Sequence, residues 1–506
     1  MLALILLIVC IDSVLCFNNL FSELKSFIVK RLPIDVNNNI VLSPKIELAT
    51  TETEQITIQN NKIYDIIDSY RLKSFNYPSK KDIKLGVLLL NLGGPESMKD
   101  VEGFLYNLFA DPDIIRLPSF LSLLQKPIAY VIAKRRAPKS SEAYESIGGG
   151  SPIVKYTSAQ ASQIENKLIG KGFNAKCYFA MRYWNPYTEE ALKQMADDNI
   201  NTLVIVPLYP QYSISTSGSS LKLLQELFYK NSETWGPDKV SHTVVPAWYY
   251  RPGYIKTMAK LILNEVTKYN DDEFKEGLHI LFSAHGVPRS YIEAGDPYQR
   301  QIEECVQFIS KEIAAQLADD ATRPSSISHE KAQYLIGKFG SKDNNIKPIK
   351  VHLSYQSRVG PVEWLKPYTE NILQDLGKDG VKNLIVVPVS FVSEHIETLE
   401  EIDMEYRELA LESGVKHWRR VPALNTDENF IDDMAQLVVE ALESPVLSLT
   451  EASMQEIDTL QNKMPFFSLT KQSNNNNNKF LMAGIVGSSL IDLFGGHPII
   501  SIVGMR

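Results

Sequence analysis

The chain has 506 residues, of which 44% are hydrophobic and 22% charged, proportions typical of a globular protein long enough for two or three domains. Its 52 Lys and Arg against 60 Asp and Glu give a net charge of -8, which argues against a broad nucleic-acid-binding surface, so we expect no nucleic-acid partner. Two of its four cysteines, Cys10 and Cys16, lie in the first 16 residues, which argues against a disulfide scaffold or a cysteine-based metal site.

The N-terminus has the pattern of a targeting signal. Leu2 to Val9 is a continuous apolar run, and Val14 and Cys16 occupy the -3 and -1 positions of a signal-peptidase site, so residues 1–16 are interpreted as a signal peptide. A membrane anchor is the alternative. Residues 17–80 show no periodic pattern and are interpreted as a targeting leader or linker. A signal followed by such a leader resembles the address of plastids reached through the endomembrane system, and another endomembrane-derived compartment is the alternative.

An internal repeat organises the middle of the chain. Pro186–Leu192 (PYTEEAL) recurs as Pro367–Leu373 (PYTENIL), and at the same offset Leu203–Pro207 (LVIVP) recurs as Leu384–Pro388 (LIVVP). Each copy is a helix-like stretch followed by a short apolar run, which predicts a helix leading into a buried parallel strand.

The first strand of each half ends in a sharp turn. Leu85–Leu90 leads into NLGGP and Leu278–Phe282 leads into SAHGVP, where Gly and Pro indicate turns. Short apolar strands alternating with helical patterns predict an α/β fold of two pseudo-repeated, doubly wound (Rossmann-like) parallel-sheet halves, with ligands at the carboxyl ends of the strands. We place the halves at 81–270 and 271–445, and interpret 320–346 as a surface insertion.

Titratable side chains follow the strands of the second half. His285 ends a buried strand, where an imidazole can accept protons near neutral pH, although a histidine there is by itself more often structural. His395 and Glu397 follow the matching strand and share one side of an extended chain. If an α-helix continues from there, Glu397, Glu401 and Glu405 line one face, which indicates either a site for a divalent first-row metal or a solvated acidic face.

Other motifs allow two interpretations each. The glycine-rich stretches Asn91–Pro95 and Ile147–Pro152 lack the spacing of phosphate-binding loops and favour close backbone approach to a flat ligand over nucleotide binding. Arg135, Arg136 and Lys139 suit either an anionic substrate group or ordinary solvation. Four aromatic residues beside the motifs are either core or walls for a planar ligand: Tyr209, Tyr212, Trp364 and Phe391.

The last part of the chain changes in character. Residues 446–479 are interpreted as a linker, with a polar run at Asn474–Asn478. Residues 480–506 contain an apolar stretch that is short beside the 20 or so residues of a membrane span. We weigh a single membrane helix there against peripheral membrane association.

Six motifs, taken together and in order, resemble those of the ferrochelatases. They are Leu90–Glu96 (LNLGGPE), Ile147–Pro152 (IGGGSP), Tyr209–Ser213 (YPQYS), Ser283–Pro288 (SAHGVP), Gln356–Pro361 (QSRVGP) and Ser393–Leu399 (SEHIETL). The resemblance is to the plastid or oxygenic-phototroph type. It implies a lyase that inserts Fe2+ into protoporphyrin IX to give protohaem and two protons, the last step of haem biosynthesis.

The resemblance also implies roles for individual residues. His285 abstracts pyrrole protons, while Glu397, with His395 beside it, takes part in iron delivery or proton removal. Glu401 and Glu405 extend a path for metal or protons, so that the implied iron-contacting set is His285, Glu397, Glu401 and Glu405. The implied porphyrin-binding residues are Leu92, Trp364 and Phe391 at the macrocycle, Arg182 and Tyr183 opposite His285, Tyr209 and Ser213 in their motif, and Arg136, Lys139, Tyr144, Ser151 and Ser357 near the propionates.

No organic cofactor is implied, because Fe2+ is a substrate. No cysteine follows Cys305, so we expect no iron-sulfur cluster of the kind that some relatives carry on a C-terminal tail. Asn478–Gly484 loosely resembles the chlorophyll-binding helix of phototroph ferrochelatases, but Lys479 and Phe480 replace the Gly and Arg of that pattern, which argues against pigment binding. A homodimer is compatible with the resemblance.

Two rival functions stay open at this stage. One is a chelatase for another ring or metal, such as coproporphyrin with iron or sirohydrochlorin with cobalt or nickel. The other is a carrier that binds haem or another solute without catalysis, a role that would not need paired acid and base residues such as Glu397 and His285.

Overall fold

The computed structural model describes residues 83–443, with gaps at 113, 116, 118, 237–238, 338–346 and 361, and short strands at 46–47, 469–471 and 480–482. The predicted signal peptide, most of the predicted leader and most of 444–506 lie outside the described residues. The chain divides into Met1–Pro44 and Lys45–Arg506, and the description below concerns the second unit.

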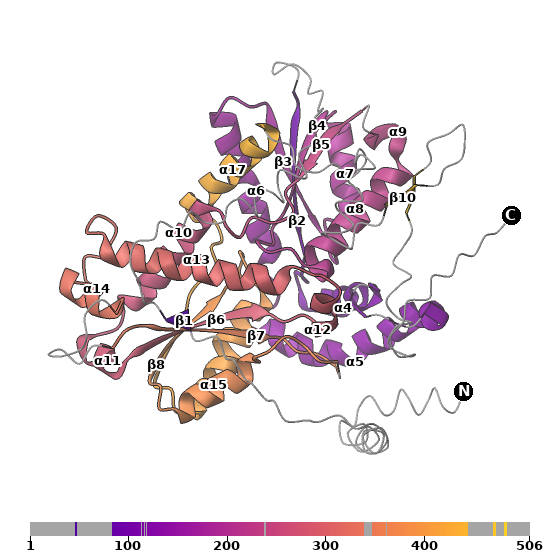
Figure 1. Ribbon diagram of the computed structural model, residues 1–506. Coiled ribbons are helices and arrows are strands. Elements are labelled where there is room, and N and C mark those ends of the chain that lie inside the picture. Colours follow the sequence, from indigo (N-terminus) through magenta and orange to yellow (C-terminus); the bar gives the residue numbers. More distant parts are fainter. Residues whose placement is uncertain are drawn as a thin grey trace, which may run out of the picture. The chain divides into compact units, whose positions relative to one another are not determined.

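The first half is built on a four-stranded parallel sheet in the order β3–β2–β4–β5 (Figure 1). The central strand has the sequence LGVLLLN and is buried along its whole length, as expected for a parallel strand covered on both faces. The strands are β2 (Leu85–Asn91), β3 (Ala175–Met181), β4 (Thr202–Pro207) and β5 (Ser241–Val244).

Helices connect these strands and cover the sheet. They are η1 (Met98–Asp100), α4 (Val101–Ala110), η2 (Ser119–Leu124), α5 (Gln125–Ser146), α6 (Ile153–Gly170), α7 (Thr188–Asp197), η3 (Ile214–Gly218), α8 (Ser219–Lys230), α9 (Ser232–Trp235) and α10 (Pro252–Val266). Within the set, η1 and η2 are 3-10 helices and η3 is a π-helix.

The second half repeats this arrangement. Its sheet has the order β1–β7–β6–β8–β9, in which β6 to β9 are parallel and the short edge strand β1 pairs antiparallel with β7. The strands are β1 (Ile46–Glu47), β6 (Leu278–His285), β7 (Lys350–Gln356), β8 (Asn383–Pro388) and β9 (His417–Arg420). The predicted fold class, an α/β protein of two parallel-sheet halves, is confirmed.

The helices of the second half are, in chain order, α11 (Asp271–Glu276), α12 (Arg289–Glu293), α13 (Tyr298–Ala318), α14 (His329–Leu335), α15 (Thr369–Lys378), η4 (Glu397–Tyr406), α16 (Arg407–Glu412) and α17 (Glu428–Glu443). The segment η4 is a π-helix. It follows β8 as the π-helix η3 follows β4, so both halves have a π-helix after equivalent strands.

The strand register fixes which residues of the two halves are equivalent. Leu90 pairs with Pro207 in the first sheet, and Ser283 pairs with Pro388 in the second. Two residues further along β2 and β6, Leu92 therefore takes the position that His285 takes in the second half. By the same count on the neighbouring strands, Arg182 and Tyr183 correspond to Gln356 and Ser357.

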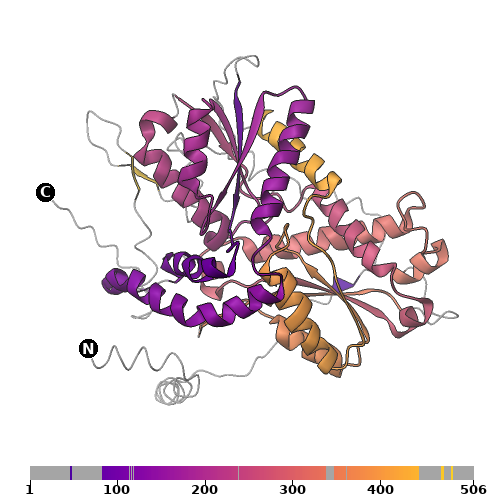
Figure 2. The ribbon, with the colours of Figure 1, turned by 180° about the vertical axis from the view of Figure 1, so that it is seen from behind.

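The division of the chain into halves is less simple than the repeat predicts. Although α17 comes after the second sheet, it packs against α6 and α10 and contacts β4 and β5 of the first half (Figure 2). Ion pairs of 2.8 Å join Lys167 to Asp432 and Arg251 to Asp433. The last described helix thus returns to the first half.

Two further segments differ from their predictions. Residues 320–346, predicted as a surface insertion, include α14, whose Ala332 and Leu335 are fully buried in the main core. Phe480–Met482, at the start of the predicted membrane helix, is the short strand β11, paired antiparallel with β10 (Leu469–Lys471). No helix in the described part of the chain is long and apolar enough to cross a membrane.

Candidate active site

His285 stands at the carboxyl end of β6, the strand between β7 and β8. Its backbone is fixed on both sides, because its N–H donates to Ser390 Oγ at 2.9 Å and its carbonyl accepts from the Tyr298 hydroxyl at 2.8 Å. The next residue must be small, since a Cβ on Gly286 would lie 2.8 Å from the Gln356 carbonyl oxygen. The strand end therefore presents an imidazole from a rigid backbone, with 33% of the side chain exposed.

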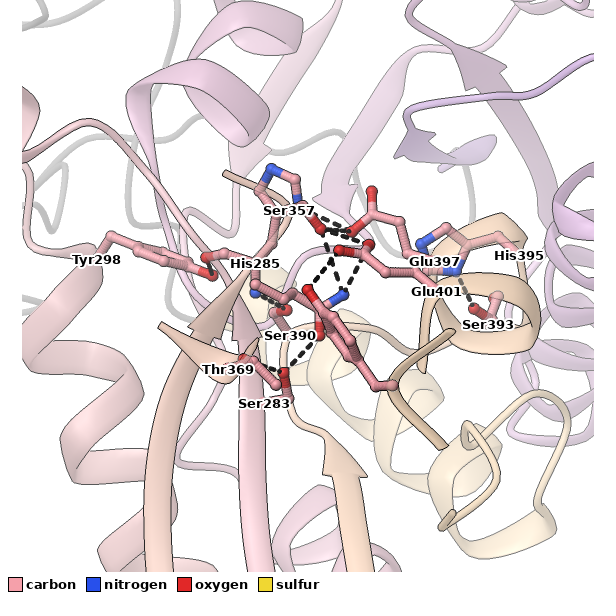
Figure 3. A network of polar contacts seen from close by, with 12 residues as sticks. Ser283, His285, Tyr298, Ser357, Thr369, Ser390, Ser393, His395, Glu397 and Glu401 are labelled. Atoms are coloured by element: carbon pink, nitrogen blue, oxygen red, sulfur yellow. Dashed lines mark hydrogen bonds and ion pairs between the residues drawn. The ribbon is translucent and has the colours of Figure 1, made fainter. Parts of the chain in front are cut away.

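The imidazole of His285 is paired with Glu397, the first residue of the π-helix η4. The distance from Nδ1 to Glu397 Oε2 is 2.8 Å (Figure 3). Burial alone would lower the pKa of His285, but the adjacent Glu397 carboxylate outweighs burial and raises it. With Nδ1–H donated to Glu397, the neutral ring offers Nε2 as a proton acceptor.

The same pairing shifts the pKa of Glu397 in the opposite direction. Burial acts to raise its pKa, yet the His285 charge and hydrogen bond, with His395 and Ser357, lower it to about 2. Glu397 is therefore a carboxylate at neutral pH. The pair has the geometry of a base oriented by a carboxylate, an arrangement used in general acid–base catalysis.

A second carboxylate, Glu401, adjoins the pair through one hydroxyl. Ser357 Oγ lies 2.6 Å from Glu401 Oε2 and 3.2 Å from Glu397 Oε2. Since a hydroxyl carries one proton, Ser357 donates to one carboxylate at a time. Burial and the neighbouring charge of Glu397 raise the pKa of Glu401 to about 7, and the Tyr406 hydroxyl donates to its other oxygen at 2.8 Å.

Ser357 is held in place by the end of β7. Its φ of 61° is in the left-handed region, which a residue with a Cβ seldom adopts. The preceding Gln356 is fixed through its Oε1, which accepts from Ser283 Oγ at 2.6 Å, and Ser283 in turn lies 3.0 Å from Thr369 Oγ1. This chain of hydroxyl groups anchors the backbone from which Ser357 reaches the two carboxylates (Figure 3).

The acidic row predicted on an α-helix face needs correction. Residues 397–406 form a π-helix, in which side chains five positions apart come together. Accordingly, the Tyr406 hydroxyl donates to Glu401. Burial and, to a smaller extent, the charge of Glu405 raise the pKa of Glu400. Glu405 is exposed, whereas Glu397 and Glu401 share the Ser357 hydroxyl.

His395 lies next to this network but is locked differently. It is 6% exposed, and its Nδ1 is 3.0 Å from the Ser393 carbonyl, which only a protonated Nδ1 can satisfy. Burial lowers its pKa, so the ring is neutral at physiological pH. The ring of Phe391 stands edge-on to both His395 at 4.4 Å and His285 at 6.3 Å, between ring centroids.

A polar cluster in the first half was not predicted as a unit. The Arg182 guanidinium and the Tyr183 hydroxyl both bond the buried carboxylate of Asp111, as does Ser219. Asp111 and Ser219 were missed because neither lies in a recognisable motif. The one signal was an Asp directly after an apolar helix, where the helix dipole disfavours a carboxylate, and a single residue of that kind is a weak signal.

The remaining predicted residues fall into several surroundings. Trp364 is buried and stands edge-on to His285 at 6.3 Å between ring centroids, and Leu92 is partly buried beside Tyr183. Tyr144 is buried in the same apolar cluster, where burial and then Glu397 raise the pKa of its hydroxyl. Arg136 and Lys139 are exposed on α5.

Two of the predicted porphyrin contacts are hydrogen-bonded within the protein, and a third is buried. Ser213 is fully buried, and its hydroxyl donates to Asp296 at 2.9 Å. Ser151 is buried in a turn, where its N–H donates to the Pro95 carbonyl at 2.7 Å. The Tyr209 hydroxyl is also buried, which raises its pKa.

No group of three or more His, Cys, Asp or Glu side chains in the described residues is arranged so that it could hold a metal ion. His285, Glu397 and Glu401 lie close together, with His285 Nδ1, Glu397 Oε2 and Glu401 Oε2 engaged with one another and with Ser357. Their contacts form a continuous hydrogen-bonded path from the imidazole through Ser357 to Glu401.

Comparison with known proteins decides the family. The model of the ferrochelatase family matches residues 84–442, the stretch that contains both sheets and the His285–Glu397 pair. The chain belongs to the ferrochelatase family. The predicted family and enzyme class, a metal chelatase of the lyase type, are confirmed.

Individual ferrochelatases show how far the likeness extends. The chain is 53% identical to the chloroplastic ferrochelatase-2 of Arabidopsis thaliana over 362 residues, covering 71% of this chain and 64% of that protein. It is 46% identical to the ferrochelatase of Nostoc punctiforme over 426 residues, covering 83% of this chain and 99% of that protein. The solved structure of SirB from Bacillus subtilis with Fe3+ is similar at 10% identity and a TM-score of 0.39, over 72% of this chain and 99% of that one.

Proposed function

We propose that this ferrochelatase-family protein inserts Fe2+ into protoporphyrin IX, giving protohaem and two protons. The observation that carries the proposal is the His285–Glu397 pair at the end of β6, joined through Ser357 to a second carboxylate whose pKa is about 7. Metal insertion releases two pyrrole protons, and the network offers a base and two carboxylates to take them.

In the proposed mechanism His285 Nε2 takes a proton from a pyrrole nitrogen. The imidazolium that forms is stabilised by Glu397, which already accepts from Nδ1 at 2.8 Å. Transfer of the Nδ1 proton to Glu397 leaves the ring neutral with its proton on Nε2, so the ring has to rotate and turn the deprotonated Nδ1 toward the porphyrin before it accepts the second pyrrole proton. Because its pKa is about 2, Glu397 holds the transferred proton only weakly and gives it to the Ser357 oxygen. Ser357 in turn gives its own hydroxyl proton to Glu401, whose pKa is about 7.

The porphyrin lies, in this proposal, between the two halves of the molecule. His285 addresses one face of the ring and Arg182 and Tyr183 the other, and Leu92, Trp364 and Phe391 supply apolar contact. Support comes from the strand register, which puts Leu92 and Tyr183 at positions equivalent to His285 and Ser357. The remaining proposed porphyrin contacts are Arg136, Lys139, Tyr144, Ser151, Tyr209, Ser213 and Ser357.

Iron is proposed to enter as a substrate and to leave as part of the product. Glu405 and Glu401 form the outer and inner positions of its path, and Glu397, His285 and His395 lie where it meets the ring. The exposed position of Glu405 and the partly buried position of Glu401 support this order. No resident organic cofactor or iron-sulfur cluster is proposed.

The setting of the enzyme is part of the proposal. The plant relative named above is chloroplastic, which supports a plastid location, reached through the endomembrane system if residues 1–16 act as a signal peptide. We further propose that the protein associates with a membrane, either peripherally or through residues 480–506, and that it forms a homodimer. Neither pigment nor nucleic acid is proposed as a partner.

The direct test is anaerobic incubation of the purified protein with Fe2+ and protoporphyrin IX. Loss of porphyrin fluorescence with the appearance of the protohaem absorption spectrum is the expected result. Parallel reactions with coproporphyrin and iron, and with sirohydrochlorin and cobalt or nickel, measure preference. A kcat/KM higher for either alternative than for protoporphyrin and iron would reject the proposed substrate.

A further inference from the structure

Asp111 is the C-cap residue of helix α4, and its side chain points into the protein and not to solvent. It is 4% exposed, although a lone carboxylate is costly to bury. Its burial is compensated by three donors on a single oxygen. Asp111 Oδ2 accepts from Arg182 Nη2 at 2.7 Å, from the Tyr183 hydroxyl at 2.7 Å and from Ser219 Oγ at 2.8 Å.

The contacts fix the guanidinium of Arg182 at two points. While Nη2 is held by Asp111, Nε donates to Ser219 Oγ at 2.9 Å. The same guanidinium lies 5.0 Å from the centre of the Tyr183 ring. A long, flexible side chain is thereby confined to one position, while 20% of its surface stays exposed.

This cluster lies against the same site as the His285 network. Tyr183 and Tyr144 belong to an apolar cluster against which Ile396 packs, and Ile396 immediately precedes Glu397. The strand register makes Arg182 and Tyr183 the counterparts of Gln356 and Ser357, which hold the two carboxylates of the second half. Each half therefore has a buried polar anchor behind the residues at its strand ends.

We propose that Asp111 is a positioning residue for porphyrin metallation: it holds the Arg182 guanidinium and the Tyr183 hydroxyl on the side of the site opposite His285. Its negative charge also offsets the positive charge of Arg182, which would otherwise repel an incoming Fe2+. This inference rests on the proposed function. Asp111 acts through Arg182 and Tyr183 and does not itself touch the ring.

The test compares Asp111→Asn with Asp433→Asn in the full-length protein. Both substitutions keep side-chain shape and break a buried Arg–Asp pair, but Asp433 pairs with Arg251 where α10 meets α17, outside the site. Anaerobic iron insertion gives kcat and KM, and thermal unfolding gives Tm. We expect Asp111→Asn to lower kcat by about 10- to 100-fold with a smaller change in the KM for porphyrin, because a misplaced contact costs rate before binding.

A double-mutant cycle separates positioning from general damage. Once Arg182 is replaced by Met and Tyr183 by Phe, adding Asp111→Asn should lower kcat little further, because both groups that Asp111 positions are already gone. If Asp111→Asn does not fold, Ser219→Ala removes one donor of the same cluster and should lower kcat by about 3- to 10-fold.

The outcomes are distinct. An active wild-type protein in which Asp111→Asn has the kcat of Asp433→Asn would overturn the inference and leave the proposed function standing. Multiplicative losses of kcat in the Arg182→Met, Tyr183→Phe background, or an unchanged kcat in Ser219→Ala where Asp111→Asn cannot be made, would also overturn it. An inactive wild-type protein would overturn the proposed function and, with it, this inference.

Discussion

Glu397 and Glu401 lie on either side of one hydroxyl, with oxygens 3.2 and 2.6 Å from Ser357 Oγ, yet their protons are held very differently. Despite burial, the pKa of Glu397 falls to about 2 because His285 is paired with it. Burial and the charge of Glu397 raise the pKa of Glu401 to about 7. The difference gives the network a direction, from the base that meets the ring to a carboxyl group able to hold a proton at neutral pH.

Replacing Glu401 with Gln should remove that acceptor. We expect kcat to fall by about 10- to 100-fold and the rise of wild-type kcat through pH 7 or so to disappear, because only ionised Glu401 accepts a proton. The raised pKa also means that Glu401 stabilises the fold at low pH and that this stabilisation is lost as pH rises through about 7. The Tm of Glu401→Gln should therefore exceed that of the wild type above that pH. Parallel Tm curves with an unchanged pH–rate profile would contradict the assignment.

Replacing Glu397 with Gln should cripple turnover, by about 100-fold or more, since the charge that stabilises the His285 imidazolium is lost. The same loss lowers the pKa of His285, which Glu397 raises in the wild type. The acidic limb of the kcat/KM profile should consequently move to lower pH in the residual activity. Steady-state rates across pH measure both effects, and a limb that stays in place would speak against the pairing.

The folded protein should also lose stability in acid through Glu397. Its pKa lies below the ordinary value of 4.5, so its contribution is present above that pH and is lost as pH falls toward about 2. The Tm difference between wild type and Glu397→Gln should shrink over this window. A difference that is constant with pH would show that the carboxylate is not ionised in the folded state.

Two substitutions of Ser357 distinguish the effect of its strained backbone from the effect of its hydroxyl group. Because its φ of 61° favours glycine, Ser357→Gly should leave Tm unchanged or raise it, while kcat falls by about 10-fold through loss of the bridging hydroxyl. Ser357→Ala is the matched control, which loses the hydroxyl and keeps the strain. Equal kcat in both variants, with the higher Tm in Ser357→Gly, is the expected pattern. Wild-type rates in both would remove the bridge from the mechanism.

Deleting residues 474–506 should leave chelatase activity in solution largely intact, since α17, the last helix of the core, ends at Glu443. The tail should affect location more than chemistry. Membrane fractionation of full-length and truncated protein tests the second point, and iron insertion the first. Equal solubility of both forms would show that the tail is no anchor, and an inactive truncated protein would show that it is no separate module.

Sequence patterns predicted the fold well, because the repeat and the buried parallel strands leave a strong hydrophobic signal. His285, at the end of β6, and Glu397, after β8, were placed correctly for the same reason, since parallel strands β6 and β8 are neighbours in the sheet. Packing between segments far apart in the sequence leaves no such signal. The amphipathic pattern of α17 indicates a buried face but not that the face packs on the first half.

The local geometry of the site was harder to predict. An α-helical spacing from Glu397 put Glu405 on the face of Glu401, whereas the π-helix pairs Glu401 with Tyr406, and no residue pattern distinguishes the two helix types. The role of Asp111 could not be predicted, because its contacts are with Arg182 and Tyr183, which are more than 70 positions away in the sequence. Contacts of that kind depend on tertiary packing.

The most direct test of the central claim is metallation by His285→Ala. The claim is that the strand-end imidazole accepts the pyrrole protons, so the variant should bind protoporphyrin with little loss of affinity, measured by fluorescence, and should insert iron at least about 100-fold more slowly. His279→Ala, on the same strand but at its other end, is the control and should keep its rate. Added imidazole should restore part of the activity of His285→Ala. Near-wild-type turnover by His285→Ala would contradict the account.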